Sequence, residues 1–169
     1  EKNWAFIVHR LDRETSGVMI FAKHKRHNEY LQEQFANRSV HRIYHALIEG
    51  RPEGNNGIIH EWLLEDKFLR VKAVNKNHPN AKEAITYWSV EDSDEFASLL
   101  SLTIETGRRH QIRVGLANLG HPVVGDKQHG AEGNPIGRIA LHASSLELLH
   151  PETDDPVRFE ATIPFGPEN

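Results

Sequence analysis

Three separate groups of polar side chains contain the residue types from which an active site could be built. The first contains Asp12, which lies in a charged turn between two apolar runs, residues 4–8 and 18–22. Such runs are typical of buried strands, and a loop held between two buried strands is positioned by a rigid scaffold. Asp12 is therefore a candidate catalytic carboxylate. The alternative is a turn residue that accepts hydrogen bonds from nearby backbone amides.

The second group lies in residues 106–113, where cationic side chains gather at the start of a predicted helix. Arg108, His110 and Arg113 are in this stretch. The helix dipole disfavours cations at this end, so the arrangement requires an anion, either a phosphate or a carboxylate from elsewhere in the fold. Asp12 is such a carboxylate. The alternative is a solvated basic turn, because surface ion pairs are common and contribute little stability.

The third candidate is Tyr44, which lies in an otherwise apolar predicted strand between Arg42 and His45. An aromatic residue in such a strand is usually part of the core, so this position alone does not indicate catalysis. A metal site is disfavoured. The chain has twelve histidines, but it has no cysteine and no His-Glu-x-x-His pattern.

Composition limits the class of protein. The chain has 169 residues, 38% of them hydrophobic, which is enough for one domain with a core of its own. No segment approaches the ~20 consecutive apolar residues that a membrane-spanning helix needs. The first residues lack the layout of a signal peptide, and the absence of cysteine excludes disulfides. We therefore expect a cytoplasmic protein that does not bind membranes.

The charge of the chain is unevenly distributed. The formal net charge of −4 argues mildly against binding nucleic acid by overall electrostatic attraction. However, acidic residues gather at 91–95 and 152–155, whereas cations gather at 23–27 and 108–109. This separation leaves room for a basic cleft in an acidic protein.

The elements that position these residues are predicted from hydrophobic periodicity. Most neighbouring strands are joined by short turns, so we expect a largely antiparallel sheet covered by about two helices, in the α+β class. The connection at residues 120–137 is longer than most, which indicates a functional loop. Besides the two apolar runs beside Asp12, strands are predicted at 40–49, 58–64, 69–74, 84–90, 96–105, 138–150 and 157–163, and helices at 26–37 and 110–119.

Five stretches, taken in order, resemble the pseudouridine synthases of the RluA type. The stretch HRLDRETSGVMIFAK resembles the catalytic motif of that family, and RIYHALIEG resembles the following strand, which carries the active-site tyrosine. AKEAITYW resembles a further strand, and TGRRHQIRVGLANLGHPVVGD resembles the motif that supplies an arginine to the catalytic aspartate. RIALHASSLELLHPET resembles the closing strand. The matched stretches cover most of the chain.

The resemblance implies roles for particular residues. Asp12 would be the catalytic carboxylate, Tyr44 the residue that contacts the target base, and Arg113 the partner of Asp12. These three are the predicted catalytic residues. The predicted substrate-binding residues are Arg10, which would enter the RNA helix as the uridine leaves, the apolar pocket residues Ile112 and Leu141, and the cationic residues Arg108 and His110.

The resemblance also implies the pseudouridine synthase fold, a mixed and mostly antiparallel sheet with flanking helices and a central catalytic cleft. We expect residues 1–169 to form the catalytic domain of a monomer that acts on rRNA or tRNA without cofactor or metal. The first strand of the family and any N-terminal RNA-binding module are expected to lie outside this sequence. Two alternatives are an inactive RNA-binding domain of the same fold and a metal-dependent hydrolase.

The sequence departs from the family pattern at three positions. Arg109 stands where threonine is usual, Gly115 where histidine is usual, and His129 near the place of a tyrosine. None of them is a predicted catalytic residue. We therefore expect them to affect the choice of RNA rather than the reaction.

Overall fold

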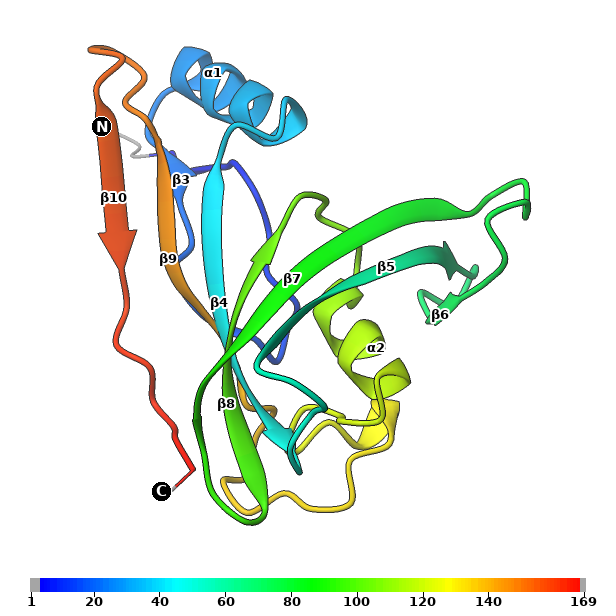
Figure 1. Cartoon of the computed structure of the whole chain (residues 1–169). Coiled ribbons are helices and arrows are strands. Elements are labelled where there is room, and N and C mark those ends of the chain that lie inside the picture. Colours follow the sequence, from blue (N-terminus) through cyan, green and yellow to red (C-terminus); the bar gives the residue numbers. More distant parts are fainter. Residues whose placement is uncertain (1–3, 168–169) are drawn as a thin grey trace.

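The computed structural model describes residues 4–167, which form one curved sheet with a helix at each end (Figure 1). The eight-stranded sheet has the order β10-β9-β4-β8-β7-β5-β6, and β2 joins it beside β9. The elements are β1 (Phe6–Ile7), β2 (Ser16–Gly17), β3 (Phe21–Ala22), α1 (Lys25–Ala36), β4 (His41–Glu49), β5 (Asn56–Glu65), β6 (Val71–Ala73), β7 (Lys82–Ser93), β8 (Ala97–Ile104), α2 (Gln111–Asn118), the 3-10 turn η1 (Lys127–His129), β9 (Leu141–Leu149) and β10 (Pro156–Glu160).

The strand pairing confirms the predicted α+β class with a mixed, mostly antiparallel sheet. Within residues 4–167 the neighbouring strands pair antiparallel, except that β2 runs parallel to β9. A separate pair, β1 with β3, packs beneath α1. The strands β5, β6 and β7 project from the body as an arm, and α2 packs against this arm (Figure 1).

Two hydrophobic clusters hold the ends of the sheet to the helices. The main cluster joins the central strands to α2 and includes Leu100, Leu102 and Leu116, all almost completely buried. A second cluster packs α1 against β9 through Leu31 and Leu146. Each fully buried side chain of this size contributes about 1.5–3 kcal/mol through removal from water. These clusters set the positions of the two walls between which a cleft opens.

The structure confirms the sequence predictions to within a few residues for both helices, for strands β4, β5 and β9, and for the hairpin of β7 and β8. The prediction of a buried strand at residues 4–8 is wrong. Strand β1 has only two residues, and the side chains of Trp4 and Ile7 are 67% and 62% exposed. Among the described residues 4–167, only one side of this segment is covered, and apolar composition alone does not show how many sides are covered.

Of the predicted strand at residues 18–22, only the last two residues form a strand, β3, and β2 lies just before the predicted range. The last strand also ends earlier than predicted, at Glu160, and Phe159 is 47% exposed. No helix within residues 4–167 is long and apolar enough to cross a membrane.

His9 connects the loop that carries Asp12 to helix α1. Its ring stacks on Phe35 with centroids 4.6 Å apart, and its Nε2 accepts a hydrogen bond from the backbone N–H of Ile20 at 3.0 Å. Burial, assisted by the positive charge of Arg42, lowers the pKa of His9 to about 4. The folded protein therefore keeps His9 neutral at pH values where an unfolded chain would protonate it.

We predict that the free energy of unfolding decreases as the pH falls from the unfolded histidine pKa of about 6.5 toward 4, because the unfolded state binds the extra proton. Since His9 is only half-buried, its contribution to this decrease in the free energy of unfolding should be roughly 1–2 kcal/mol. His9→Phe keeps the stacked ring and should flatten this part of the curve, whereas the exposed His24→Phe should not. Urea unfolding across this range is the measurement, and parallel curves for parent and His9→Phe would contradict the prediction.

Candidate active site

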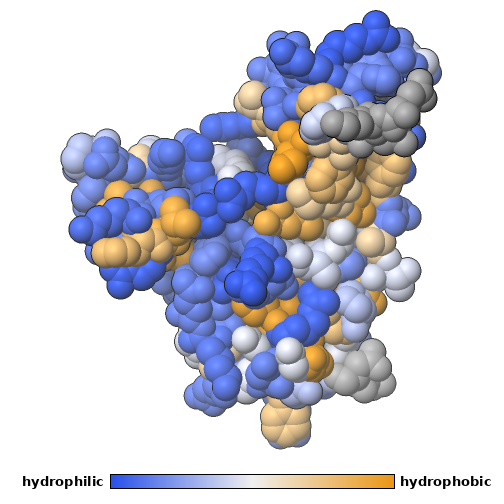
Figure 2. Space-filling model, turned by 180° about the vertical axis from the view of Figure 1, so that it is seen from behind, coloured by the Kyte–Doolittle hydropathy of each residue, from blue (hydrophilic) through white to orange (hydrophobic). Residues whose placement is uncertain are grey.

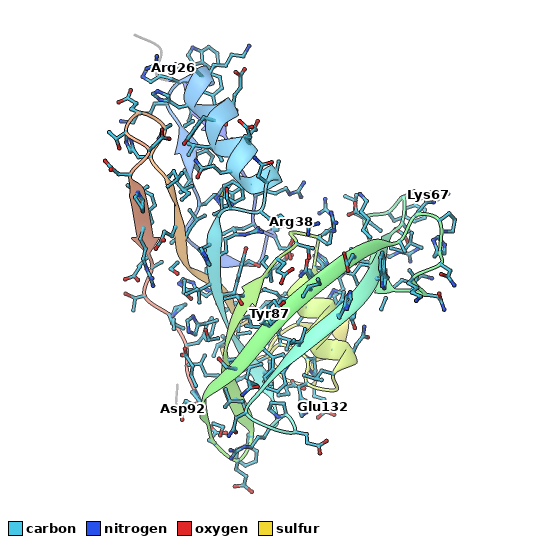
Figure 3. All side chains as sticks on the ribbon, turned by 45° about the horizontal axis from the view of Figure 1, so that its top comes forward. Arg26, Arg38, Lys67, Tyr87, Asp92 and Glu132 are labelled. Atoms are coloured by element: carbon cyan, nitrogen blue, oxygen red, sulfur yellow. The ribbon has the colours of Figure 1, made fainter. Side chains whose placement is uncertain are left out.

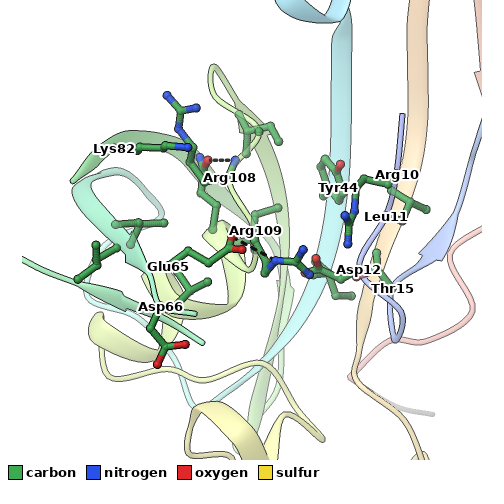
Figure 4. A pocket seen from close by; sticks show the side chains of 18 of the residues that line it. Arg10, Leu11, Asp12, Thr15, Tyr44, Glu65, Asp66, Lys82, Arg108 and Arg109 are labelled. Atoms are coloured by element: carbon green, nitrogen blue, oxygen red, sulfur yellow. Dashed lines mark hydrogen bonds and ion pairs between the residues drawn. The ribbon is translucent and has the colours of Figure 1, made fainter. Parts of the chain in front are cut away.

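A cleft of about 680 Å³ lies between the body of the molecule and the projecting arm. One wall contains Asp12, in the loop before β2, and Tyr44 of β4. The opposite wall contains Glu65 at the end of β5, together with Lys82 and Arg108 (Figure 4). The space-filling view shows the molecule hollowed between the arm and the lobe that carries α1 (Figure 2).

The Asp12 loop is fixed by a close approach of β2 to β9. Gly17 has a φ of +119°, and a Cβ at this position would lie 2.1 Å from the carbonyl oxygen of Ala143. Only glycine allows this contact, because any side chain would overlap the backbone of β9. Ser16 accepts a hydrogen bond from Arg138 at 2.6 Å, and the N–H of Thr15 donates to the carbonyl oxygen of Asp12 at 2.9 Å. The loop is therefore held from both sides.

Arg113 is the cation closest to Asp12, as predicted, but its main partner is a different carboxylate. Its Nη1 lies 4.0 Å from the carboxylate of Asp12 and 3.7 Å from that of Glu14. Its Nε and Nη2 donate to the two carboxylate oxygens of Asp126 at 2.7 and 2.8 Å. Arg113 is 1% exposed and Asp126 is completely buried. The guanidinium thus lies between the buried carboxylate of Asp126 and the loop that carries Asp12, and Arg113 is not itself among the residues that line the cleft.

The ionisation of Arg113 is maintained by Asp126. Burial alone would lower the pKa of Arg113, but the hydrogen bonds and negative charge of Asp126 outweigh it and raise the pKa. Asp126 was not predicted from the sequence. The signals were the length of the loop at 120–137 and the stretch TGRRHQIRVGLANLGHPVVGD, whose last residue is Asp126. In the structure Gly125 precedes Asp126 with a φ of +81°. A Cβ on Gly125 would lie 2.1 Å from the carbonyl oxygen of Arg138, so this turn also requires glycine.

His110, a predicted substrate-binding residue, lies beside Arg113 and is not among the residues that line the cleft. Nη1 of Arg113 donates to Nε2 of His110 at 3.1 Å, and Nδ1 of His110 is 3.1 Å from Nε2 of His129. Burial lowers the pKa of both histidines, and the charge of Arg113 lowers each further. His110 is therefore neutral, carries its proton on Nδ1 and donates it toward His129. The two rings support the guanidinium of Arg113.

The other predicted site residues line the cleft. Tyr44 is partly buried, and burial raises the pKa of its hydroxyl, so the phenol is protonated at neutral pH. Ile112 and Leu141 are buried at the base of the cleft, whereas Arg10 is exposed on its wall. Arg108 donates from its Nε to the carbonyl oxygen of Glu83 at 3.0 Å, which fixes its side chain across the arm.

The cleft is more basic than the chain as a whole. Its lining includes Arg109, which pairs with Glu65 at 3.2 Å, and Lys67, at the tip of the arm (Figure 3). The sequence predictions included only two of the cationic residues in this lining. Six Lys and Arg residues line the cleft, namely Arg10, Arg42, Lys67, Lys82, Arg108 and Arg109. Only three Asp and Glu residues do so, namely Asp12, Glu65 and Asp66. No group of three or more metal-ligating side chains is found within the described residues 4–167.

Known proteins provide an independent comparison. The family model described as RNA pseudouridylate synthase matches residues 1–118. The chain is 38% identical over 164 residues to the uncharacterized RNA pseudouridine synthase YhcT of Bacillus subtilis, which covers 96% of this chain and 54% of the relative. It is 40% identical over 169 residues to the uncharacterized RNA pseudouridine synthase ZMO0505 of Zymomonas mobilis, covering 96% of this chain and 75% of the relative.

A solved structure with the same fold is human RNA Pseudouridylate Synthase Domain Containing 1, with a TM-score of 0.84 and 27% sequence identity. The match covers 98% of this chain and 71% of the human chain. The chain therefore belongs to the RNA pseudouridylate synthase family. It spans about half the length of most of the curated relatives it matches.

We predict that Asp126→Ala destabilises the fold by ~3–5 kcal/mol, because it leaves the buried guanidinium of Arg113 without its counter-charge. Urea unfolding would measure this loss. The exposed pair of Arg158 and Glu160 at 2.7 Å is the matched control, and Glu160→Ala should cost about 0–1 kcal/mol. A loss in Asp126→Ala no larger than in the control would mean that the buried pair does not hold α2 to the loop at 120–137.

Proposed function

We propose that the chain is the catalytic domain of an RNA pseudouridine synthase that isomerises uridines in structured RNA, either rRNA or tRNA. The observation that carries the proposal is the position of Asp12 inside a basic cleft, opposite the buried guanidinium of Arg113. Tyr44, Ile112 and Leu141 line the same cleft and supply an aromatic and apolar surface for a base. Family membership supports the same reaction.

The reaction breaks the bond between N1 of uracil and C1′ of the ribose, turns the base, and joins C5 to the same C1′. The proton on C5 is lost and N1 gains one, so atoms and electrons balance within the substrate. This isomerisation requires no oxidant, reductant or cofactor. A carboxylate can add to the sugar or ring, or remove a proton, provided that it is ionised and poorly hydrated.

Asp12 is proposed as that carboxylate. Its side chain is 19% exposed, so bound RNA would remove most of the remaining water. Arg113 places a positive charge beside Asp12, since its Nη1 lies 4.0 Å from the carboxylate in a mostly buried site. Asp126 and His110 keep that guanidinium in place, so we assign His110 a positioning role instead of contact with RNA.

Tyr44 is proposed to stack on the uracil and to place its hydroxyl near C5. Burial raises the pKa of that hydroxyl, so at neutral pH it acts as a protonated donor and an inefficient base. Its role in loss of the C5 proton would therefore be to orient the base or to relay the proton.

The target uridine must leave its helix to reach the cleft, at a cost of a few kcal/mol. Arg10 is exposed on the cleft wall and is proposed to fill the vacated place in the stack. Arg108 is proposed to contact phosphate. Recognition would depend on the shape of a loop or stem and on splayed bases. We further propose that the domain acts as a monomer in the cytoplasm.

We predict that Asp12→Asn lowers turnover at least ~1,000-fold, as expected for removal of an essential reacting group. The measurement is release of tritium from RNA labelled at C5 of uridine, prepared from cells that lack the gene. Glu14→Gln is the matched control, because Glu14 is also close to Arg113 but is half exposed. The control should stay near the parent rate.

Two outcomes would contradict the proposal. Equal tritium release from Asp12→Asn and parent would show that Asp12 is neither nucleophile nor base. A parent protein that binds the RNA but releases no tritium from it would favour the alternative, an inactive RNA-binding domain.

A further inference from the structure

Arg42 is a cationic residue of the cleft wall that is left without a counter-charge. It lines the cleft beside Tyr44, yet none of the ion pairs within residues 4–167 includes it. Its Nε is buried and meets no hydrogen-bond acceptor in this part of the chain. A buried donor without a partner is uncommon in folded proteins, so Arg42 requires an explanation.

The surroundings of Arg42 hold the side chain in place. Arg42 and Tyr44 are two residues apart on β4, so both side chains point to the same face of the sheet. The guanidinium carbon lies 5.6 Å from the ring centre of Phe35, within the range of a cation–π contact. On another side, a Cβ added to Gly107 would lie 3.2 Å from Nη1 of Arg42. The guanidinium is therefore packed between α1 and the turn before α2.

Two other arginines near the cleft are paired with carboxylates. Arg109 pairs with Glu65 at 3.2 Å, and Arg113 pairs with Asp126 at 2.7 Å. The titratable groups next to Arg42 supply no anion, because His9 is kept neutral and the Tyr44 hydroxyl remains protonated. Asp12 lines the same cleft, but among the described residues no carboxylate forms an ion pair with Arg42. A guanidinium that is held by packing and has no such pair is suited to an external anion.

We propose that Arg42 binds a phosphate of the RNA backbone beside the target nucleotide. A guanidinium offers a planar fork of donors that fits two phosphate oxygens. Because Arg42 is adjacent to Tyr44 on the same strand face, the phosphate would belong to the nucleotide placed in the cleft or to its immediate neighbour. That the ligand is RNA rests on the proposed function. That the group bound by Arg42 is a phosphate rests on the geometry around its guanidinium.

The test is the salt dependence of binding to a uridine-containing stem–loop RNA. Loss of one phosphate contact lowers the slope of log K against log salt by about 0.7–0.9. In Arg42→Gln the magnitude of this slope should therefore decrease by about this amount. The affinity should fall by roughly tenfold, uniformly across RNA sequences. Arg42→Lys should recover the slope but only part of the affinity, because an ammonium is a point charge without the fork. Arg158→Gln, a change at an exposed pair on β10, should leave the slope unchanged.

A parent slope in Arg42→Gln would overturn the proposal. If Arg42→Gln kept the parent slope but inorganic phosphate, at matched ionic strength, no longer competed with RNA for this variant, Arg42 would bind free phosphate only. Arg42→Gln could be less stable than the parent, which would show as unfolding at a much lower urea concentration. In that case the affinity of Arg42→Lys, which keeps the buried aliphatic stem, provides the test in a folded variant. Because binding alone is measured, these results are independent of the tritium assay on Asp12→Asn.

Discussion

The buried ion pair between Arg113 and Asp126 is the interaction on which the candidate site depends. A guanidinium that is 1% exposed must have a hydrogen-bonded counter-charge, and Asp126 supplies both oxygens at 2.7 and 2.8 Å. This pair joins α2 to the loop at 120–137 and holds Nη1, which donates to His110, 4.0 Å from the carboxylate of Asp12. The glycine at position 17 fixes the other partner, since it alone lets the Asp12 loop approach β9. Fold and site therefore share the same residues.

Charge pairing explains how an acidic chain can present a basic cleft. With a net charge of −4, the protein still places six Lys and Arg residues against three carboxylates in the cleft lining. Two of these carboxylates, Glu65 and Asp66, pair with Arg109 and Arg70. The acidic residues 91–95 lie in and after β7 and do not line the cleft. Local separation of charge, and not the total, makes the lining of the cleft basic.

Local sequence patterns were sufficient for much of the fold and for part of the site. The alternation of Leu100 and Leu102 predicted the β8 strand, and the spacing of Ile112 and Leu116 predicted α2, because these periodicities reflect burial on one face. Asp126 and Arg42 could not be predicted in this way. The importance of each depends on contacts with residues distant in sequence: Asp126 with Arg113, and Arg42 with Phe35 and the backbone at Gly107. The same limitation explains the error at residues 4–8, where the side chains of Trp4 and Ile7 are not covered by any part of the chain that the structure describes.

The most direct measurement is a crystal structure of the domain bound to an RNA that carries 5-fluorouridine at the modified position. We expect the fluorinated base in the cleft against Tyr44, the carboxylate of Asp12 facing the ribose and ring, and Arg113 still between Asp12 and Asp126. A uridine bound outside the cleft, or an Asp12 carboxylate directed to solvent while the base is held elsewhere, would contradict it.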